Sequence, residues 1–306
     1  MKHIAIQLTI IAALLAGGCS DESHPVASDN LGILDMFTPG ADAAPEARQI
    51  FDDYGVWVRT RFASVQEITN GILEVDATVR RYGAENLDEG RLHEVYAYSS
   101  ALLSNVSREF TRAFFPLEIF YVKTYGASYW IYPLKLLGRS RLIISWPNDP
   151  ANTAPVADPA NYYYQDSTLA TGVWRLIATS ITARLEEPVA EFVAAGKAYD
   201  NGKAYDQILN AYYSDYDVAK YDAAIEELMN TGGYLSGGGS RDFRSDFADW
   251  IRLLATESRE NIQRDYLDNS AALANKYEAV VNFARRYQWD IQAAGNKFRQ
   301  QYDAHK

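Results

Sequence analysis

Histidine is the scarcest of the residues that could perform chemistry in this chain. The 306 residues include four, His3, His24, His93 and His305, and only His93 is far enough from the ends to lie in a folded core. An H-E-x-x-H zinc motif needs two histidines four residues apart on one helical face. The residue four positions after His93 is Ala97. We therefore expect His93 to be a half-buried helix residue and not a zinc ligand.

Other catalytic arrangements have little support. Ser-His-Asp or Cys-His catalysis would again depend on His93, and no G-x-S-x-G segment is present. The glycine-rich segment 231–239 lacks the Lys-Ser or Lys-Thr ending of a phosphate-binding loop. Two acidic pairs, Glu186 with Glu187 and Asp246 with Asp249, could flank a sugar bond as in glycosidases. The charged faces of solvated helices have the same composition, so both interpretations stay open.

Tyrosine is unusually frequent, with 22 residues, and two clusters are expected in or near loops. Exposed rings can stack on the apolar faces of sugars while neighbouring Asp, Asn and Gln side chains bind hydroxyl groups. The alternative is that the rings fill the core. The candidate ligand-binding residues are Tyr162, Tyr163, Tyr164, Tyr212 and Tyr213.

Composition limits the class of protein. The chain is 48% hydrophobic and 23% charged, which is typical of a globular protein. Its formal net charge of -11 leaves no basic surface for nucleic acid, so nucleic acid is not an expected partner. The single cysteine, Cys19, excludes internal disulfides and zinc sites built from cysteine. We expect one compact body without a cofactor.

The first residues have the layout of a secretory signal. Lys2 is followed by an apolar run from Ile4 to Leu15, which is shorter than the roughly 20 residues of a membrane span. The segment then ends in Ala16-Gly17-Gly18-Cys19, which resembles the lipobox of bacterial lipoproteins. We expect residues 1–18 to be removed and lipid on Cys19 to attach the protein to a membrane.

The next segment, residues 19–45, reads as a flexible tether. It is rich in Asp, Ala, Pro and Gly. Its acidic start, Ser20-Asp21-Glu22-Ser23, resembles the export signal of lipoproteins on the outer face of the outer membrane, although an acidic linker has the same composition. We therefore expect an outer-membrane, surface-exposed, lipid-anchored protein.

The rest of the chain, residues 46–303, predicts one domain with early strands and late helices. Strands are expected at 55–62, 116–122 and 141–146, because each range is a short run of alternating or continuous apolar residues. Helical periodicity extends over 87–115, over 168–194 with a break near Pro188, and over the segments beginning near 243, 277 and 291. The order of elements indicates an α+β fold with a small N-terminal sheet and a mostly helical C-terminal half.

Several segments together resemble a known family. They are the lipobox, Asp52-Asp53-Tyr54-Gly55-Val56-Trp57-Val58, the helix 168–187, the segment 233–249, and the ending Lys276-Tyr277-Glu278-Ala279-Val280-Val281 followed by Trp289-Asp290-Ile291. Their order and spacing over residues 45–303 resemble the zinc-binding metallopeptidase lipoproteins associated with substrate import at the outer membrane. The resemblance implies a zincin-like α+β domain, a helix with H-E-x-x-H, and a downstream acidic zinc ligand.

The implied zinc ligands are missing from this chain. The matching helix has Ala178 and Thr182 where the histidines should stand and Thr179 where the catalytic base should stand. The downstream acidic ligand is replaced by Ser245. Since a catalytic zinc normally has three protein ligands, we expect no bound metal at these positions.

The sequence therefore favours a degenerate metallopeptidase-like domain without catalysis. Such a lipoprotein would bind a glycan or peptide, or act as a scaffold, beside an outer-membrane import complex. The alternative is an active peptidase or glycosidase with a rearranged carboxylate site at Glu186, Glu187, Asp246 and Asp249.

Overall fold

A computed structural model describes residues 37–69, 75, 77–126, 134–138, 140–146, 162–237 and 242–305. The elements belong to one compact unit, Pro39–Lys306, which contains the predicted domain 46–303. The predicted signal peptide, Cys19 and most of the predicted tether lie outside the described residues. Within the ranges above, every helix is too short or too polar to cross a bilayer.

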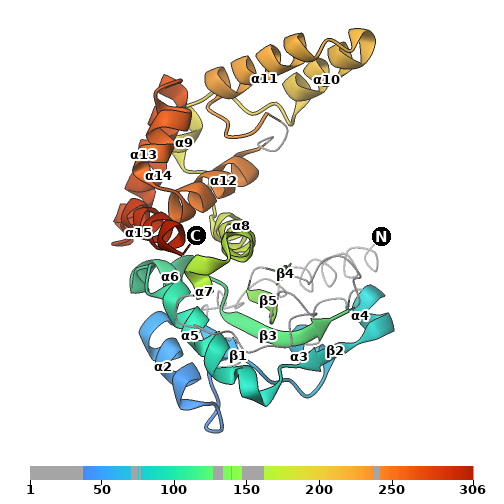
Figure 1. The fold of residues 1–306 in the computed structure, drawn as a ribbon, viewed down its shortest axis with the longest axis vertical. Coiled ribbons are helices and arrows are strands. Elements are labelled where there is room, and N and C mark those ends of the chain that lie inside the picture. The colour runs from blue at the N-terminus through green and yellow to red at the C-terminus, as the bar shows by residue number, and fades with distance from the viewer. Residues whose placement is uncertain are drawn as a thin grey trace, which may run out of the picture. The chain divides into compact units, whose positions relative to one another are not determined.

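The unit combines a small mixed sheet with a helical C-terminal half, so the predicted α+β class is confirmed (Figure 1). Its strands are β1 (Trp57–Arg59), β2 (Ala84–Asn86), β3 (Glu118–Tyr125), β4 (Leu134–Leu137) and β5 (Arg141–Ser145). Its helices are α2 (Pro45–Tyr54), α3 (Val65–Thr69), α4 (Ala77–Tyr82), η2 (Glu89–Arg91), α5 (Leu92–Leu103), α6 (Arg108–Phe114), α7 (Tyr162–Gln165), α8 (Ser167–Arg184), α9 (Ala190–Ala194), α10 (Lys203–Asp215), α11 (Val218–Gly232), α12 (Phe243–Thr256), α13 (Arg259–Ile262), η3 (Gln263–Leu267), α14 (Ala271–Arg286) and α15 (Ile291–Ala304).

Strand β3 is the centre of the sheet. It pairs in parallel with β1 at its start and with β5 on the other side, and it pairs antiparallel with β2 near its end. Strand β4 lies beyond β5 and runs antiparallel to it, which gives the order β1-β3-β5-β4. The three predicted strands are therefore β1, β3 and β5, whereas β2 and β4 were not expected.

The two faces of the sheet bury different cores, because successive side chains of a strand point in opposite directions. Ile119 and Tyr121 of β3 join the large core formed with the helices. Phe120 and Val122 join a smaller core on the other face, together with Val79 of α4. A parallel strand covered on both faces is expected to be a continuous apolar run, as the central part of β3, residues 119–122, is.

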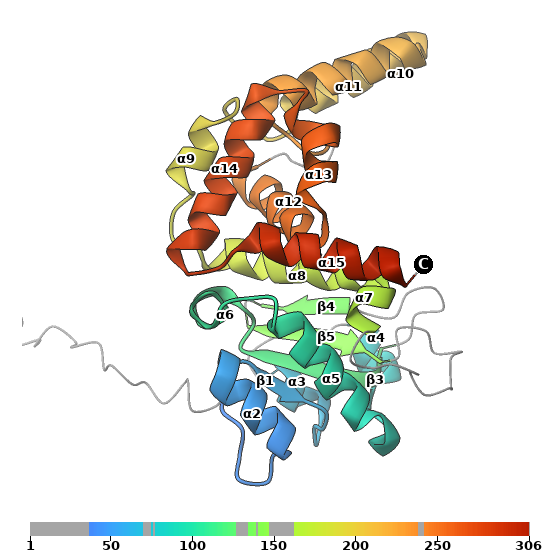
Figure 2. The ribbon, with the colours of Figure 1, turned by 60° about the vertical axis from the view of Figure 1, so that its left-hand side comes forward.

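Helix α8 connects the sheet to the C-terminal helices. It contacts β4 and β5 on one side and α12 on the other, and both views show it between them (Figures 1 and 2). Asp166 caps its start by accepting a hydrogen bond from the backbone N–H of Leu169 at 2.8 Å. The helix ends at Arg184, four residues before the break predicted at Pro188. The chain resumes as the separate helix α9 after Pro188, which has no N–H to continue the helix.

The last part of the chain returns to its first half. Trp289 stacks on Trp174 with ring centres 5.7 Å apart, and its Nε1 donates to the carbonyl of Asn105 at 2.8 Å. Ser107 donates its hydroxyl proton to the carbonyl of Tyr287 at 2.6 Å. The sheet-side helices and the C-terminal helices thus share one core.

Candidate functional site

The site that the family resemblance predicts lies where α8 and α12 pack together. Helix α12 is amphipathic, and it buries Phe247, Trp250 and Leu254. Its first turn is fixed by Asp242, which accepts from the N–H of Ser245 at 3.0 Å, while the Ser245 hydroxyl lies 3.4 Å from the N–H of Asp242. This reciprocal pair is a capping box, and it places the start of α12 beside the last turns of α8.

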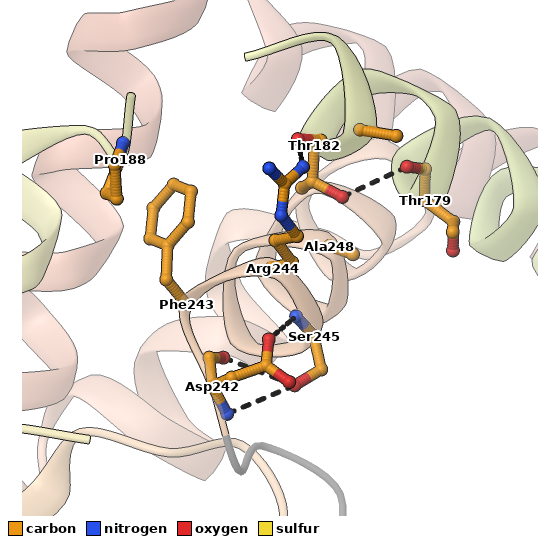
Figure 3. A pocket seen from close by; sticks show the side chains of 9 residues that line it. Thr179, Thr182, Pro188, Asp242, Phe243, Arg244, Ser245 and Ala248 are labelled. Atoms are coloured by element: carbon orange, nitrogen blue, oxygen red, sulfur yellow. Dashed lines mark hydrogen bonds between the residues drawn. The ribbon is translucent and has the colours of Figure 1, made fainter. Parts of the chain in front are cut away.

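A pocket of about 550 Å³ opens between these two helix ends (Figure 3). Its lining includes three of the four positions at which the resemblance implies zinc-site residues, Thr179, Thr182 and Ser245. The fourth, Ala178, is fully buried and is not part of the lining. The fold thus brings Ser245 of α12 beside Thr182 of α8, 63 positions earlier in the chain.

The hydroxyl groups of these residues serve the local backbone. Thr179 donates to the carbonyl of Arg175 at 2.8 Å, and Thr182 donates to the carbonyl of Thr179 at 3.0 Å. Such bonds to the preceding turn are typical of threonine inside a helix. Ser245 is engaged in the capping box. None of these three hydroxyls therefore has its proton directed at a ligand in the pocket.

Arg244 supplies the positive charge of the pocket, whose lining also includes the carboxylate of Asp242. It is the residue after Phe243 in the first turn of α12, and its guanidinium extends toward the end of α8 (Figure 3). Nη1 donates a hydrogen bond to the backbone carbonyl of Thr182. In the part of the chain that the structure describes, no carboxylate forms an ion pair with Arg244. The guanidinium has five N–H donors, so it retains donors for a bound group.

Zinc does not fit this arrangement. Protein ligands of zinc are thiolate, imidazole or carboxylate groups, whereas the four implied positions hold a methyl group and neutral hydroxyls. The one carboxylate in the lining, Asp242, accepts from the N–H of Ser245 as the cap of α12, and the guanidinium of Arg244 adds a positive charge beside it. Within the described residues, no three His, Cys, Asp or Glu side chains lie close enough together to hold a metal ion. His93 is exposed on α5, not half-buried as predicted, and lies outside this lining.

The acidic residues of the alternative hydrolase site do not converge on the pocket either. None of Glu186, Glu187, Asp246 and Asp249 lines it. Glu186 and Glu187 are exposed in the loop after α8, and Asp249 lies 3.9 Å from Arg252 in an ion pair. Asp246 is fully buried on another face of α12.

Asp246 belongs to a buried polar cluster. Its Oδ2 accepts from Lys276 Nζ at 2.5 Å and from the Tyr199 hydroxyl at 2.7 Å. Lys276 also donates to the carbonyl of Gly232 at 3.0 Å, and its ammonium lies 4.5 to 5.4 Å from the ring centres of three aromatic residues, Phe192, Tyr199 and Tyr234. The cluster joins α12, α14 and the end of α11, which indicates a structural role.

Burial changes the titration of this pair. Desolvation raises the pKa of Asp246 to about 6, although Lys276 and Tyr199 act in the opposite direction. Desolvation also lowers the pKa of Lys276, against the effect of Asp246. In both cases the neutral form gains because water is excluded from the charged group.

The predicted tyrosine sites divide into two groups. Tyr163 and Tyr164 are buried, so they do not present the exposed rings that were predicted. They lie in α7, not in a loop, where Tyr163 accepts from Trp174 Nε1 at 2.6 Å and Tyr162 packs partly buried against Trp146. Their rings fill the core and their hydroxyls find partners there, as tyrosine can do.

Tyr212 and Tyr213 lie instead near the end of α10, where Tyr213 is 57% exposed. Helix α10 buries none of its residues, so these rings are not part of the core. Of the five predicted ligand-binding tyrosines, these two therefore remain candidates.

Sequence reasoning missed two features. Arg244 immediately precedes Ser245, the position of the implied acidic zinc ligand. A positive charge next to that position could have indicated a site for an anion. The pair of Asp246 and Lys276 joins two helices 30 positions apart, and nothing in the local sequence marks it.

Comparison with known proteins gives little further information. No protein-family model and no curated protein matches the chain. One solved structure that it resembles is a protein of Bacteroides caccae ATCC 43185 provisionally described as a zinc-binding metallopeptidase. The TM-score is 0.46 with 14% identity, over 86% of this chain and 95% of that one. A likeness at this TM-score is too weak to assign a function, so the chemistry of the pocket is inferred from the residues that line it.

Proposed function

We propose that this chain is a lipid-anchored protein of the outer cell surface whose degenerate metallopeptidase-like domain binds a ligand without hydrolysing it. The observation that carries the proposal is the guanidinium of Arg244 in a pocket that has Thr179, Thr182 and Ser245 at the implied zinc positions. The Asp242 carboxylate in the same lining is engaged as the cap of α12. The guanidinium is therefore the charged group that retains donors for a ligand, and it favours an anionic group beside the positions where a zinc ion would be bound.

The chemistry of the pocket favours a ligand with a carboxylate group. An arginine binds carboxylates through two parallel hydrogen bonds, and Phe243, Ala183 and Ala248 supply apolar walls for the rest of a small molecule. The C-terminus of a peptide and an acidic sugar both carry such a group. Either ligand would suit a protein that works beside an import complex for peptides or glycans.

The binding experiment compares matched charged and neutral probes by calorimetry. Alanyl-alanine is compared with its C-terminal amide, and glucuronic acid with glucose. We expect the carboxylates to bind and their neutral counterparts to bind at least about tenfold more weakly, since a hydrogen bond to a charged group contributes about 1.5–3 kcal/mol. Arg244→Ala should remove the difference, whereas Arg285→Ala, an exposed arginine of α14, should leave it unchanged.

Metal content tests the non-catalytic part of the proposal. After dialysis against trace zinc, elemental analysis of the purified protein should find almost no zinc. About one zinc per chain would overturn the proposal and direct attention back to His93. The alternative hydrolase requires that alanine at Glu186, Glu187, Asp246 and Asp249 abolishes a measurable activity, and the burial of Asp246 against Lys276 argues against it.

The anchor rests on the lipobox-like segment that ends at Cys19. Cells grown with labelled palmitate should incorporate the label, and Cys19→Ser should abolish incorporation and release the protein from membranes. Surface exposure is tested by protease treatment of intact cells. Replacing Asp21 and Glu22 by alanine should protect the protein if these residues act as an export signal.

A further inference from the structure

The α10–α11 hairpin, residues 203–232, contributes almost nothing to the core. Helix α10 has no buried residue, and the only buried residue of α11 is Gly232 at its end. The two helices lie side by side (Figures 1 and 2), and beyond this mutual packing α11 contacts α14. The outer surfaces of this pair of helices are therefore free of a structural role in the core.

The tip of the hairpin exposes hydrophobic surface. The described part of the chain exposes four large hydrophobic side chains, and three of these, Tyr213, Tyr216 and Val218, lie within six residues of one another. Tyr212 joins them, since its ring centre is 5.7 Å from that of Tyr213 and 5.8 Å from that of Tyr216. Neighbouring exposed apolar side chains of this kind are a feature of protein interaction sites.

The backbone at the tip adds an independent observation. Tyr216 has a φ of 54° and lies in the left-handed region. This conformation costs an ordinary L-residue about 1–2 kcal/mol, and the same position at a helix end usually holds glycine. A large aromatic residue at a position that favours glycine indicates that its ring is needed.

The charge of the hairpin defines its partner. Residues 203–232 contain six acidic and two basic residues, a formal charge of -4 of the total -11 in about a tenth of the chain. At the tip, Lys220 already pairs with Asp215 at 3.0 Å and with Asp217 at 3.2 Å. Tyrosine rings among surplus carboxylates attract arginine and lysine side chains, because cations stack on ring faces and pair with carboxylates.

We infer that the tip of the α10–α11 hairpin is a docking surface for a basic segment of a partner protein. Tyr213 and Tyr216 contact the cationic side chains of that segment, and the acidic residues of the hairpin pair with the remaining charges. A groove of about 310 Å³ between the helices, lined in part by Ile208, Tyr212 and Tyr221, receives an apolar side chain of the same segment. This surface is separate from the pocket at Arg244, because the two share no lining residue.

The test measures binding of a dye-labelled peptide of alternating arginine and leucine to the full chain by fluorescence anisotropy. The comparison probes are the same peptide with glutamine in place of arginine, and a neutral maltohexaose. The double variant Tyr213→Ser/Tyr216→Gly removes the rings and relieves the left-handed strain, so it should fold as well as the unchanged chain. Tyr82→Ser is the control, since Tyr82 is also exposed, at 51%, but lies in α4.

We expect the arginine peptide to bind, the double variant to weaken it about tenfold or more, and Tyr82→Ser to leave it unchanged. Raising the salt concentration from 0.05 to 0.5 M should weaken the binding of the arginine peptide to the unchanged chain, because salt screens the charges. Equal binding by the double variant would overturn the inference, because the affinity would then be due to the net charge of the whole protein. Equal binding of the glutamine peptide, or binding of maltohexaose that the double variant abolishes, would also overturn it.

Discussion

Replacement of Lys276 by methionine tests the buried pair directly. Methionine preserves most of the volume of the side chain but removes the ammonium that lies 2.5 Å from Asp246. The carboxylate would then keep only the hydroxyl of Tyr199 as a donor, since its Oδ1 already has no hydrogen-bond partner within the described residues. Removing one member of a buried ion pair typically costs about 3–5 kcal/mol, and we expect a loss of that size in the free energy of unfolding at pH 8.

The loss should depend on pH with a definite sign. The pKa of Asp246 is already raised to about 6, and Lys276 is one of the groups that hold it down. The variant should therefore have a still higher pKa at this carboxyl. A carboxyl whose pKa is higher in the folded than in the unfolded state favours folding while protonated, and this contribution disappears as the pH rises through the folded pKa. The penalty of Lys276→Met should thus be smaller at pH 5 than at pH 8 by at least about 1.4 kcal/mol, the equivalent of one pKa unit.

Urea unfolding at pH 5.0, 6.5 and 8.0 measures this penalty. Lys197→Met is the control, because Lys197 is exposed in the nearby loop after α9, and it should change stability by less than about 0.5 kcal/mol. Asp246→Asn in the Lys276→Met background should recover part of the loss at pH 8 and little at pH 5. A penalty below 1 kcal/mol, or one that is equal at pH 5 and pH 8, would refute the assignment of Asp246 as a buried charge held by Lys276.

Three further substitutions test other parts of the fold, each by urea unfolding. Gly295→Ala should destabilise the protein by about 1–3 kcal/mol, because the added Cβ would lie 2.1 Å from the carbonyl of Leu254; no loss would mean that α15 and α12 can separate freely. Tyr216→Gly should leave stability equal or raise it by up to about 1 kcal/mol, and a clear loss would contradict the left-handed strain at this residue. His93→Ala should change stability by less than about 0.5 kcal/mol, since the side chain is exposed, and a larger loss would place His93 in the core after all.

The accuracy of the sequence-based prediction followed the length of the apolar pattern. The runs that became β3 and β5 are five to eight residues long and almost wholly buried, so their composition alone identifies them. Strand β4 has four residues, of which only Leu137 is buried, and such a short edge strand has no distinct period. The periodicity of α8 was correct, but its end was not, because Leu185 continues the apolar spacing beyond Arg184, where the helix stops.

The sequence related the residues that line the pocket to one another, but it did not give the chemistry of the pocket. The resemblance related Ser245 to Thr179 and Thr182, and the packing of α8 against α12 brings these three residues to one pocket. The orientation of Arg244 depends on where the carbonyl of Thr182 lies in space, which no sequence pattern specifies. Tyrosine was the least predictable residue, because its ring suits a core and its hydroxyl suits a surface.

The contacts of Trp289 and Tyr287 with residues 105–107 have a consequence for the biosynthesis of the protein. The hydrogen bonds join residues 184 and 180 positions apart, so the core of the first half is incomplete until almost the whole chain has been delivered. Contacts of such long sequence separation slow folding. If the chain is exported from its N-terminus, as we propose, it would therefore stay loose and compatible with translocation during the transfer, and its native structure would be completed when the last helices arrive on the far side.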